Sequence, residues 1–262
     1  MLSPLKKLTL VTLAAITFPL GAQTAEERGL EIVIEADRRD TGFGDFSVEM
    51  TMLLRNAQGE EAVRHMRNRI MEVEGDGDKS MIVFDRPRDV KGTALLTFTH
   101  KTGVDDQWLY LPALKRVKRI ASRNKSGPFM GSEFAYEDLT SQEVEKYTYR
   151  FVEEAELYGV PMFLVERDPV DKYSGYTRQL VWIHQAEYRP EKIEFYDRKN
   201  ALLKTLVFRN YKQYLGQFWR ADEMFMQNHP TGKSTLLTWS DYKFRNGFSD
   251  ADFNKNALKR MK

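Results

Sequence analysis

Residues 46–74, FSVEMTMLLRNAQGEEAVRHMRNRIMEVE, alternate apolar and polar side chains on both sides of a short polar turn. The apolar positions of the first half fall on one face of a strand: Phe46, Val48, Met50, Met52 and Leu54. This period of two is typical of a half-buried strand. Residues 56–59 (NAQG) are turn formers, and 61–74 is the predicted returning strand. Its outward positions are expected to include Arg64, Arg67 and Arg69. The stretch therefore predicts an antiparallel hairpin.

The same pattern recurs along the rest of the chain. Further strands are predicted at 79–84, 93–101, 107–111, 146–154, 161–166, 179–184, 192–196, 202–214, 218–227 and 234–244. The connections between them are mostly short and carry turn residues, and no linker-like shift of composition separates two parts. About 12 consecutive strands joined in this way predict one mainly β domain, an antiparallel meander that curls into a barrel or half-barrel.

Two segments are expected to be helical. The charged segment 26–40 has the spacing of a short amphipathic helix, although its apolar residues also fit an alternating strand. Near the C-terminus, Ser249 is a candidate N-cap with acidic residues after it, and Phe248 is placed to contact Phe253. We expect this C-terminal helix to cover an open end or edge of the sheet.

The N-terminus has the pattern of an export signal. Lys6 and Lys7 precede a mostly apolar run at 8–20, which small residues close. The run is too short for a helix that crosses a hydrocarbon layer of about 30 Å. We therefore expect residues 1–22 to be a signal peptide, with cleavage after Ala22 or Ala25, and residues 23–262 to form the single domain of an exported protein.

Composition narrows the function classes. The 262 residues include 40 Lys and Arg, 38 Asp and Glu and no cysteine. The near balance of charge argues against a nucleic-acid binder, and the absence of cysteine excludes disulfides, thiolate metal sites and a cysteine nucleophile. It also excludes a lipid anchor on cysteine.

Apparent catalytic and ligand motifs are incomplete. The sequence GKST at 232–235 lacks the earlier glycine of a phosphate loop and leads into a strand. Asp76 and Asp78 lack the remaining ligands of a calcium loop, and the four histidines have no ligand spacing. Ser132 is not flanked as a nucleophile elbow. We therefore expect no enzyme activity, metal or cofactor; a hydrolase is the third and least favoured candidate.

Several strands are rich in aromatic residues and methionine. One interpretation is an ordinary core; the other is a curved sheet that encloses a cavity for an acyl chain, since flexible methionine side chains suit variable apolar ligands. The residues expected to line this lipid-binding cavity are Phe46, Val48, Met50, Met52, Leu96, Phe98, Trp108 and Tyr110.

The segment 128–139, PFMGSEFAYEDL, interrupts the strands with apolar side chains, and Ser126, Gly127 and Gly131 are expected to act as mobile joints. Met130 and Phe134 have i, i+4 spacing, so the segment predicts a short helical lid over the mouth of the sheet. A static plug is the alternative. The expected lid residues are Phe129, Met130, Phe134, Tyr136 and Leu139.

A basic run precedes this segment at 114–125. It is either a solvated pair of strands or a docking surface for an acidic partner or anionic lipid head groups; nucleic acid is a weaker third alternative. The expected docking residues are Lys115, Arg116, Lys118 and Arg119.

The stretches WLYLPALKRVKRI (108–120) and GPFMGSEFAYEDL (127–139) resemble the signature of LolA-like outer-membrane lipoprotein-sorting proteins. More narrowly, the chain is similar to the larger branch associated with resistance–nodulation–division-type exporters, over roughly residues 46–262. The resemblance implies a strongly curved antiparallel half-barrel with a helical lid, and a periplasmic role in carrying acyl chains from the inner to the outer membrane. The chain is longer than the classical carrier, and no sheet arginine that contacts the lid can be assigned from the sequence.

We therefore expect a monomeric periplasmic carrier of lipid or lipoprotein acyl chains. An inner-membrane exporter and an outer-membrane acceptor are the candidate protein partners. The alternative function is a periplasmic accessory protein of an inner-membrane exporter, with a filled core and no lipid cargo.

Overall fold

The computed structural model describes residues 23–260, and the predicted signal peptide at 1–22 lies outside them. The described chain forms one 13-stranded antiparallel sheet. The strands are β1 (Asp45–Arg55), β2 (Glu61–Met71), β3 (Lys79–Arg86), β4 (Ala94–Phe98), β5 (Asp106–Leu111), β6 (Arg116–Arg119), β7 (Tyr147–Leu157), β8 (Val160–Pro169), β9 (Tyr176–His184), β10 (Pro190–Asp197), β11 (Leu202–Tyr214), β12 (Phe218–Asn228) and β13 (Ser234–Phe244). The helices are α1 (Ala25–Asp40) and α2 (Lys255–Arg260). The mainly β, antiparallel prediction is confirmed; the strand absent from the sequence-based set is β6.

The sheet consists of two meanders, β1 to β6 and β7 to β13. They are joined where the first strand, β1, pairs with the last strand, β13. The strand order of the sheet is β6-β5-β4-β3-β2-β1-β13-β12-β11-β10-β9-β8-β7. Strand β1 pairs with β2 on one side, as the hairpin at 46–74 predicted, and with β13 on the other. The two free edges are therefore β6 and β7, which follow one another in the sequence.

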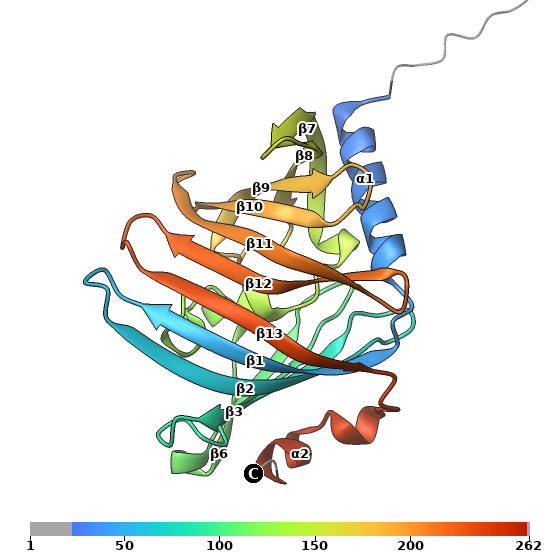
Figure 1. Ribbon diagram of the computed structural model, residues 1–262. Helices are drawn as coiled ribbons and strands as arrows, with labels where there is room; N and C mark the ends of the chain where they lie inside the picture. The colour runs from blue at the N-terminus through green and yellow to red at the C-terminus, as the bar shows by residue number, and fades with distance from the viewer. Residues whose placement is uncertain (1–22, 261–262) are drawn as a thin grey trace, which may run out of the picture.

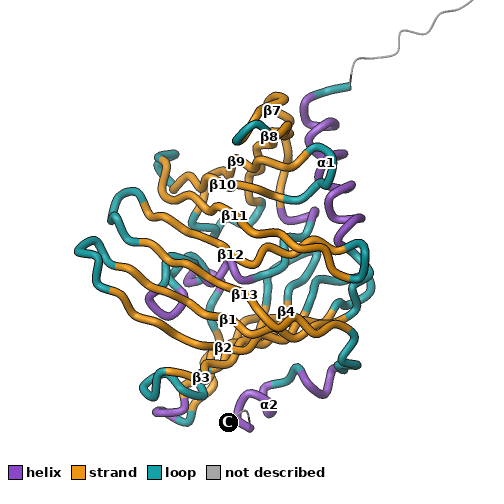
Figure 2. The backbone as a smooth tube through the Cα atoms, viewed as in Figure 1, coloured by secondary structure: helices purple, strands orange, loops and turns teal. Residues whose placement is uncertain are grey.

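The sheet curves strongly and does not close, and the segment between β6 and β7 runs inside the curve (Figure 1). Figure 2 shows this segment as loops and short helical turns surrounded by strands. The turns are η2 (Ser122–Asn124), η3 (Phe129–Gly131), η4 (Tyr136–Leu139) and η5 (Val144–Lys146). We call residues 120–146 the inner segment.

The two faces of the sheet are buried differently. The concave face carries the main core, with side chains from nearly every strand, and includes Met52, Phe84 and Met226. A second, smaller cluster lies on the other face of β3, β4 and β5, where Phe253 and Leu258 of the C-terminal segment cover it. These three strands are therefore apolar on both faces, unlike a sheet with one wet face.

The N-terminal helix α1 packs along the free edge β7. Thr24 caps it in a reciprocal capping box with Glu27. Gly29 lets the helix approach closely, since a Cβ atom there would lie 2.7 Å from the backbone nitrogen of Phe151. The segment is thus a helix and not the alternating strand.

The C-terminal segment is shorter and more broken than the predicted helix. Ser249 caps the 3₁₀ turn η6 (Asp250–Asp252), and α2 begins only afterwards. Phe248 contacts Phe253 edge to face, with ring centroids 6.0 Å apart. Together the two short helices cover the outer face of β4 and β5 and not an end of the sheet. Among residues 23–260, no helix is both long and apolar enough to cross a membrane.

Candidate functional site

A cavity of about 1470 Å³ lies between the concave face of the sheet and the inner segment. Its walls are mainly apolar side chains of β8 to β13, with a few from β1, β2 and β3. The apolar wall residues are Val165, Val181, Ile183, Ile193, Phe195, Leu206, Leu237, Phe46, Ile70 and Ile82. The cavity exceeds the range of roughly 300–1,000 Å³ common for small-molecule pockets.

The residues predicted to line a cavity divide between the two faces. Phe46 lines it, and Val48, Met50 and Met52 are buried in the concave core without reaching the cavity surface. The other four belong to or pack against the second cluster on the opposite face, which includes Phe253 and Leu258: Leu96, Phe98, Trp108 and Tyr110. Contrary to the prediction, none of these four residues lines the cavity.

The physical reason for this correction is the period of two. Leu95 and Leu109 belong to the concave core, so their neighbours in the same strands must point outward. Both sets are equally apolar, because the C-terminal segment covers the outer face. The pattern alone could not show which set points inward.

The predicted lid residues are all in the inner segment and in contact with the concave core. Phe129 and Phe134 are fully buried, whereas Met130, Tyr136 and Leu139 are half-buried. The segment is not an α-helix. Met130 has φ of 50° and Gly131 of 78°, and these left-handed residues turn the chain back so that Pro128 pairs with Ala135. In place of one short helix, the segment forms the two 3₁₀ turns η3 and η4, with a reversal of the chain between them.

A buried ion pair fixes the inner segment to the sheet. Lys204 Nζ lies 2.6 Å from Asp138 Oδ2, and the side chains are only 4% and 6% exposed. Lys204 also donates to the carbonyl oxygen of Glu133 at 2.9 Å, and the Tyr176 hydroxyl donates to Asp138 Oδ1 at 2.8 Å. These bonds satisfy both charges, as a buried pair requires.

Further hydrogen bonds reach the inner segment from other strands. Gln107 of β5 donates to the carbonyl oxygen of Tyr136 at 2.9 Å. Asn228 of β12 donates to Glu133 Oε2 at 2.6 Å, and the backbone N–H of Glu133 donates to the Thr235 hydroxyl at 3.0 Å. The segment is therefore a hydrogen-bonded wall of the cavity.

Arg64 of β2 also reaches the inner segment. Its guanidinium donates to the carbonyl oxygen of Met130 and lies 6.0 Å from the ring centroid of Phe84. The expectation that Arg64 points outward is wrong, whereas Arg69 does point outward and contacts Phe248.

Arg64 and Lys204 were both missed as site residues. Each is a cation at an inward position of its strand, with the same parity as Met66 and Leu206 respectively. Their position on the inward face of the strand, read from the alternation of apolar residues, is the signal that could have identified them.

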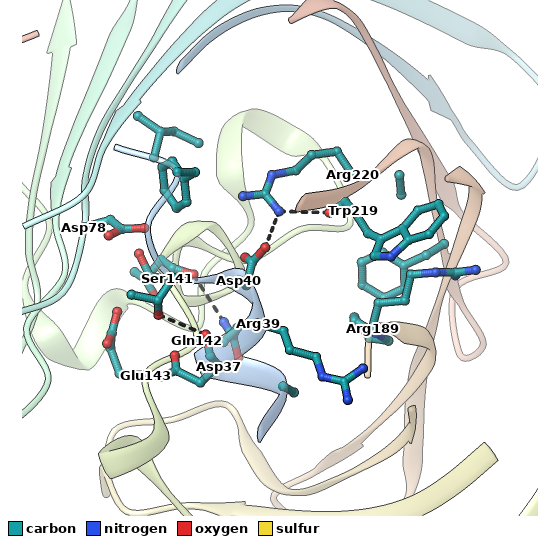
Figure 3. A pocket seen from close by; sticks show the side chains of 18 of the residues that line it. Asp37, Arg39, Asp40, Asp78, Ser141, Gln142, Glu143, Arg189, Trp219 and Arg220 are labelled. Atoms are coloured by element: carbon teal, nitrogen blue, oxygen red, sulfur yellow. Dashed lines mark hydrogen bonds and ion pairs between the residues drawn. The ribbon is translucent and has the colours of Figure 1, made fainter. Parts of the chain in front are cut away.

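The mouth of the cavity carries charged groups from α1, from the turn after β2 and from the end of the inner segment. In Figure 3, Asp78 and Glu143 lie on one side, Arg220 and Arg189 on the other, and Asp40 between them. Arg220 pairs with Asp40, and its guanidinium lies 5.2 Å from the ring centroid of Phe43. Burial, and then the neighbouring carboxyl groups, raise the pKa of Asp78 to about 7 and that of Glu143 to about 7.

The predicted docking residues lie at the free edge of the sheet. Arg116, Lys118 and Arg119 are exposed in β6, and Lys115 precedes them with φ of 49°. Arg119 pairs with Asp106 of the neighbouring strand. These four cations follow one another along this edge, and none of them lines the cavity. Among the described residues, no cluster of three or more His, Asp or Glu has the placement of a metal site.

We predict that neutralising the mouth carboxyls stabilises the protein at high pH. The ordinary pKa values of Asp78 and Glu143 are 3.8 and 4.5, so the folded protein holds these protons more tightly than the unfolded chain does. Their destabilising effect is therefore absent near pH 4, grows as the pH rises and is complete above pH 7. Asp78→Asn and Glu143→Gln should each raise the free energy of unfolding at pH 8 by about 1–3 kcal/mol. Urea unfolding at pH 4.5 and 8 measures this, and an equal gain at both would contradict it.

We also predict a large effect of breaking the buried ion pair. Lys204→Met leaves Asp138 charged and buried, so the free energy of unfolding should fall by about 3–5 kcal/mol. Lys212→Met on the same strand is the matched control, because Lys212 pairs with Asp222 at 2.5 Å but is 65% exposed. That control should lose at most about 1 kcal/mol. Similar losses in urea unfolding of the two variants would show that burial of the pair is unimportant.

Comparisons with known proteins agree with this architecture. A crystal structure described as an outer membrane lipoprotein-sorting protein domain from Vibrio parahaemolyticus is 60% identical, with a TM-score of 0.88 over 90% of this chain and 100% of that one. A DUF1329 family protein from Desulfovibrio piger is 30% identical, with a TM-score of 0.85 over 90% and 99% of the two chains.

A LolA superfamily protein from Nitrosomonas europaea shares the fold at 22% identity, with a TM-score of 0.71 over 90% and 100%. A family model described as "Uncharacterized protein" matches residues 76–260. None of the curated proteins compared with the chain gives a match. The high identity over the whole of the Vibrio domain shows the family: the chain belongs to the family of outer-membrane lipoprotein-sorting proteins, in agreement with the resemblance found in the sequence.

Proposed function

We propose that this protein is a non-enzymatic periplasmic carrier that binds an acyl chain of a lipid or lipoprotein in its concave cavity. The observation that supports this most is the cavity itself, about 1470 Å³ with walls of Val, Ile, Leu and Phe side chains. A water-filled cavity of this kind leaves apolar surface wet, and a chain that displaces the water gains about 0.8 kcal/mol for each buried CH₂.

The inner segment has a defined part in this function. Phe134 and Leu139 line the cavity on the side opposite the sheet, so a bound chain lies between them and the strands. Arg64 and Lys204 hold this wall in place through Met130, Glu133 and Asp138. The segment therefore shields the chain from water.

We further propose that the carrier is a monomer exported by its N-terminal signal, which takes its cargo from an inner-membrane exporter and delivers it to an outer-membrane acceptor. The family, named for lipoprotein sorting in the Vibrio relative, supports this route. The signal-like pattern of residues 1–22 supports the compartment.

The carrier proposal predicts co-purification with lipid and uptake of a fluorescent fatty acid. Ala221→Trp should reduce this uptake at least about tenfold, because the side chain of Ala221 lines the cavity and an indole there fills space without adding charge. Native mass spectrometry of periplasmic protein and fluorescence titration are the measurements. Ala57→Trp in the exposed turn after β1 is the control and should bind normally.

Repeated recovery of protein without lipid, together with no uptake of the fatty acid, would refute the carrier proposal. Equal uptake by the Ala221 variant would instead show that the chain binds elsewhere.

A second candidate function is that of an accessory protein docked on an exporter. The observation in its favour is the row of exposed cations on the free edge β6, which can receive an acidic partner. The charge reversals Arg116→Glu and Arg119→Glu should abolish exporter co-purification and leave lipid uptake unchanged. Exporter co-purification that survives these reversals would argue against docking through this edge. Lys199→Glu with Lys233→Glu, two exposed cations in other turns, is the control with the same change of net charge.

A further inference from the structure

Four of the five arginines that line the cavity are already neutralised by carboxylates, and the fifth, Arg167, donates to Gln179 Oε1 at 2.8 Å. Arg220 pairs with Asp40, and Arg189 pairs with Glu187 and with Glu191. On α1, both Arg38 and Arg39 lie 2.7 Å from the Glu35 carboxylate. An anionic head group that arrives at the mouth would have to compete with these partners.

The opposite side of the mouth carries carboxylates without such partners. Glu143 is only 8% exposed, yet its carboxylate makes neither an ion pair nor a hydrogen bond to any residue in 23–260. It lines the cavity mouth beside Asp78, and Figure 3 shows both side chains on the same side of the opening. Burial of an unpartnered carboxylate is costly unless a cation joins it.

We propose that this side of the mouth binds the positively charged amino head group of an amphiphile whose acyl chain occupies the cavity. The inference rests on the proposed carrier function and names the class of its cargo. An ammonium group between Asp78 and Glu143 neutralises these carboxylates. On the other side of the mouth, Arg189 and Arg220 neutralise theirs. The same cavity has apolar walls, with Ile82 and Phe46 among the lining residues.

The surrounding groups favour a cation at this position. Asp37 of α1 and Glu72 at the end of the β2 region add negative charge near the pair. Lys101 is the cation that faces them; it lines the mouth and lowers the pKa of Glu143. The remaining charged neighbours are Asp40, Glu145 and Lys146. An added ammonium favours the ionised carboxylates, so its binding should release protons and should strengthen as the pH rises through 7.

Three amphiphiles with the same tetradecyl chain test the proposal: the trimethylammonium, the maltoside and the fatty acid myristate. Each is used below its micellar concentration to displace a fluorescent chain probe from the full chain. At pH 8 the trimethylammonium compound should bind about tenfold more tightly than the maltoside and more tightly still than myristate. At pH 6 its advantage should shrink, whereas the affinity of the maltoside should not change.

The double variant Asp78→Asn, Glu143→Gln should lose the preference for the trimethylammonium compound and keep its affinity for the maltoside. Because these substitutions remove buried charge, the variant should fold at least as stably as the wild type, and thermal unfolding checks this. Glu154→Gln on the exposed face of β7 is the matched control and should keep the preference.

Equal binding of the three amphiphiles by the wild type, or a preference that survives in the double variant, overturns the amino-head-group proposal and leaves the carrier function intact. Failure of the protein to bind any of the three, or the probe, overturns both.

Discussion

The pairing of β1 with β13 determines how the rest of the molecule is arranged. It joins the two ends of the meander at the centre of the sheet, so that β6 and β7, neighbours in the sequence, lie at opposite free edges. The chain between them must therefore cross from one edge to the other. Because the sheet curves, the path taken runs over the concave face (Figure 1). The inner wall of the cavity is thus a consequence of sheet topology.

A segment that crosses a concave apolar face needs hydrogen-bond partners for its buried backbone N–H and C=O groups, because such groups are cut off from water. The inner segment does this with 3₁₀ turns and with side chains that the strands supply, such as Gln107 for the Tyr136 carbonyl and Arg64 for that of Met130. The Lys204–Asp138 pair adds a fixed point at its far end. The inward polar side chains of Arg64, Gln107 and Lys204 on otherwise apolar strands are therefore explained by the segment that they hold.

The sequence was sufficient for the β class, the first hairpin and the family, because alternation and turn residues are local signals. It was not sufficient for the orientation of β4 and β5. Leu95 and Leu96 are equally apolar, and only the return of Phe253 and Leu258 to the outer face distinguishes them. The single short helix expected at 128–139 was not found for a related reason. The i, i+4 spacing of Met130 and Phe134 suggested a helix, but contacts with Lys204, some 70 residues away in the chain, decide its conformation.

The inner segment and the mouth of the cavity offer two different routes by which a ligand could enter. Lifting the inner segment would break the buried Lys204–Asp138 pair and its bonds to several strands, and would leave both charges unsatisfied in an apolar surrounding. The mouth has no such barrier, since it is bounded by the end of α1 and by charged side chains that already face the opening. For the proposed acyl-chain cargo, end-on entry through the mouth leaves these contacts of the inner segment intact. In that orientation the chain terminus lies deepest and the head group stays among the charges at the mouth, which is the arrangement that the separation of apolar walls from charged rim favours.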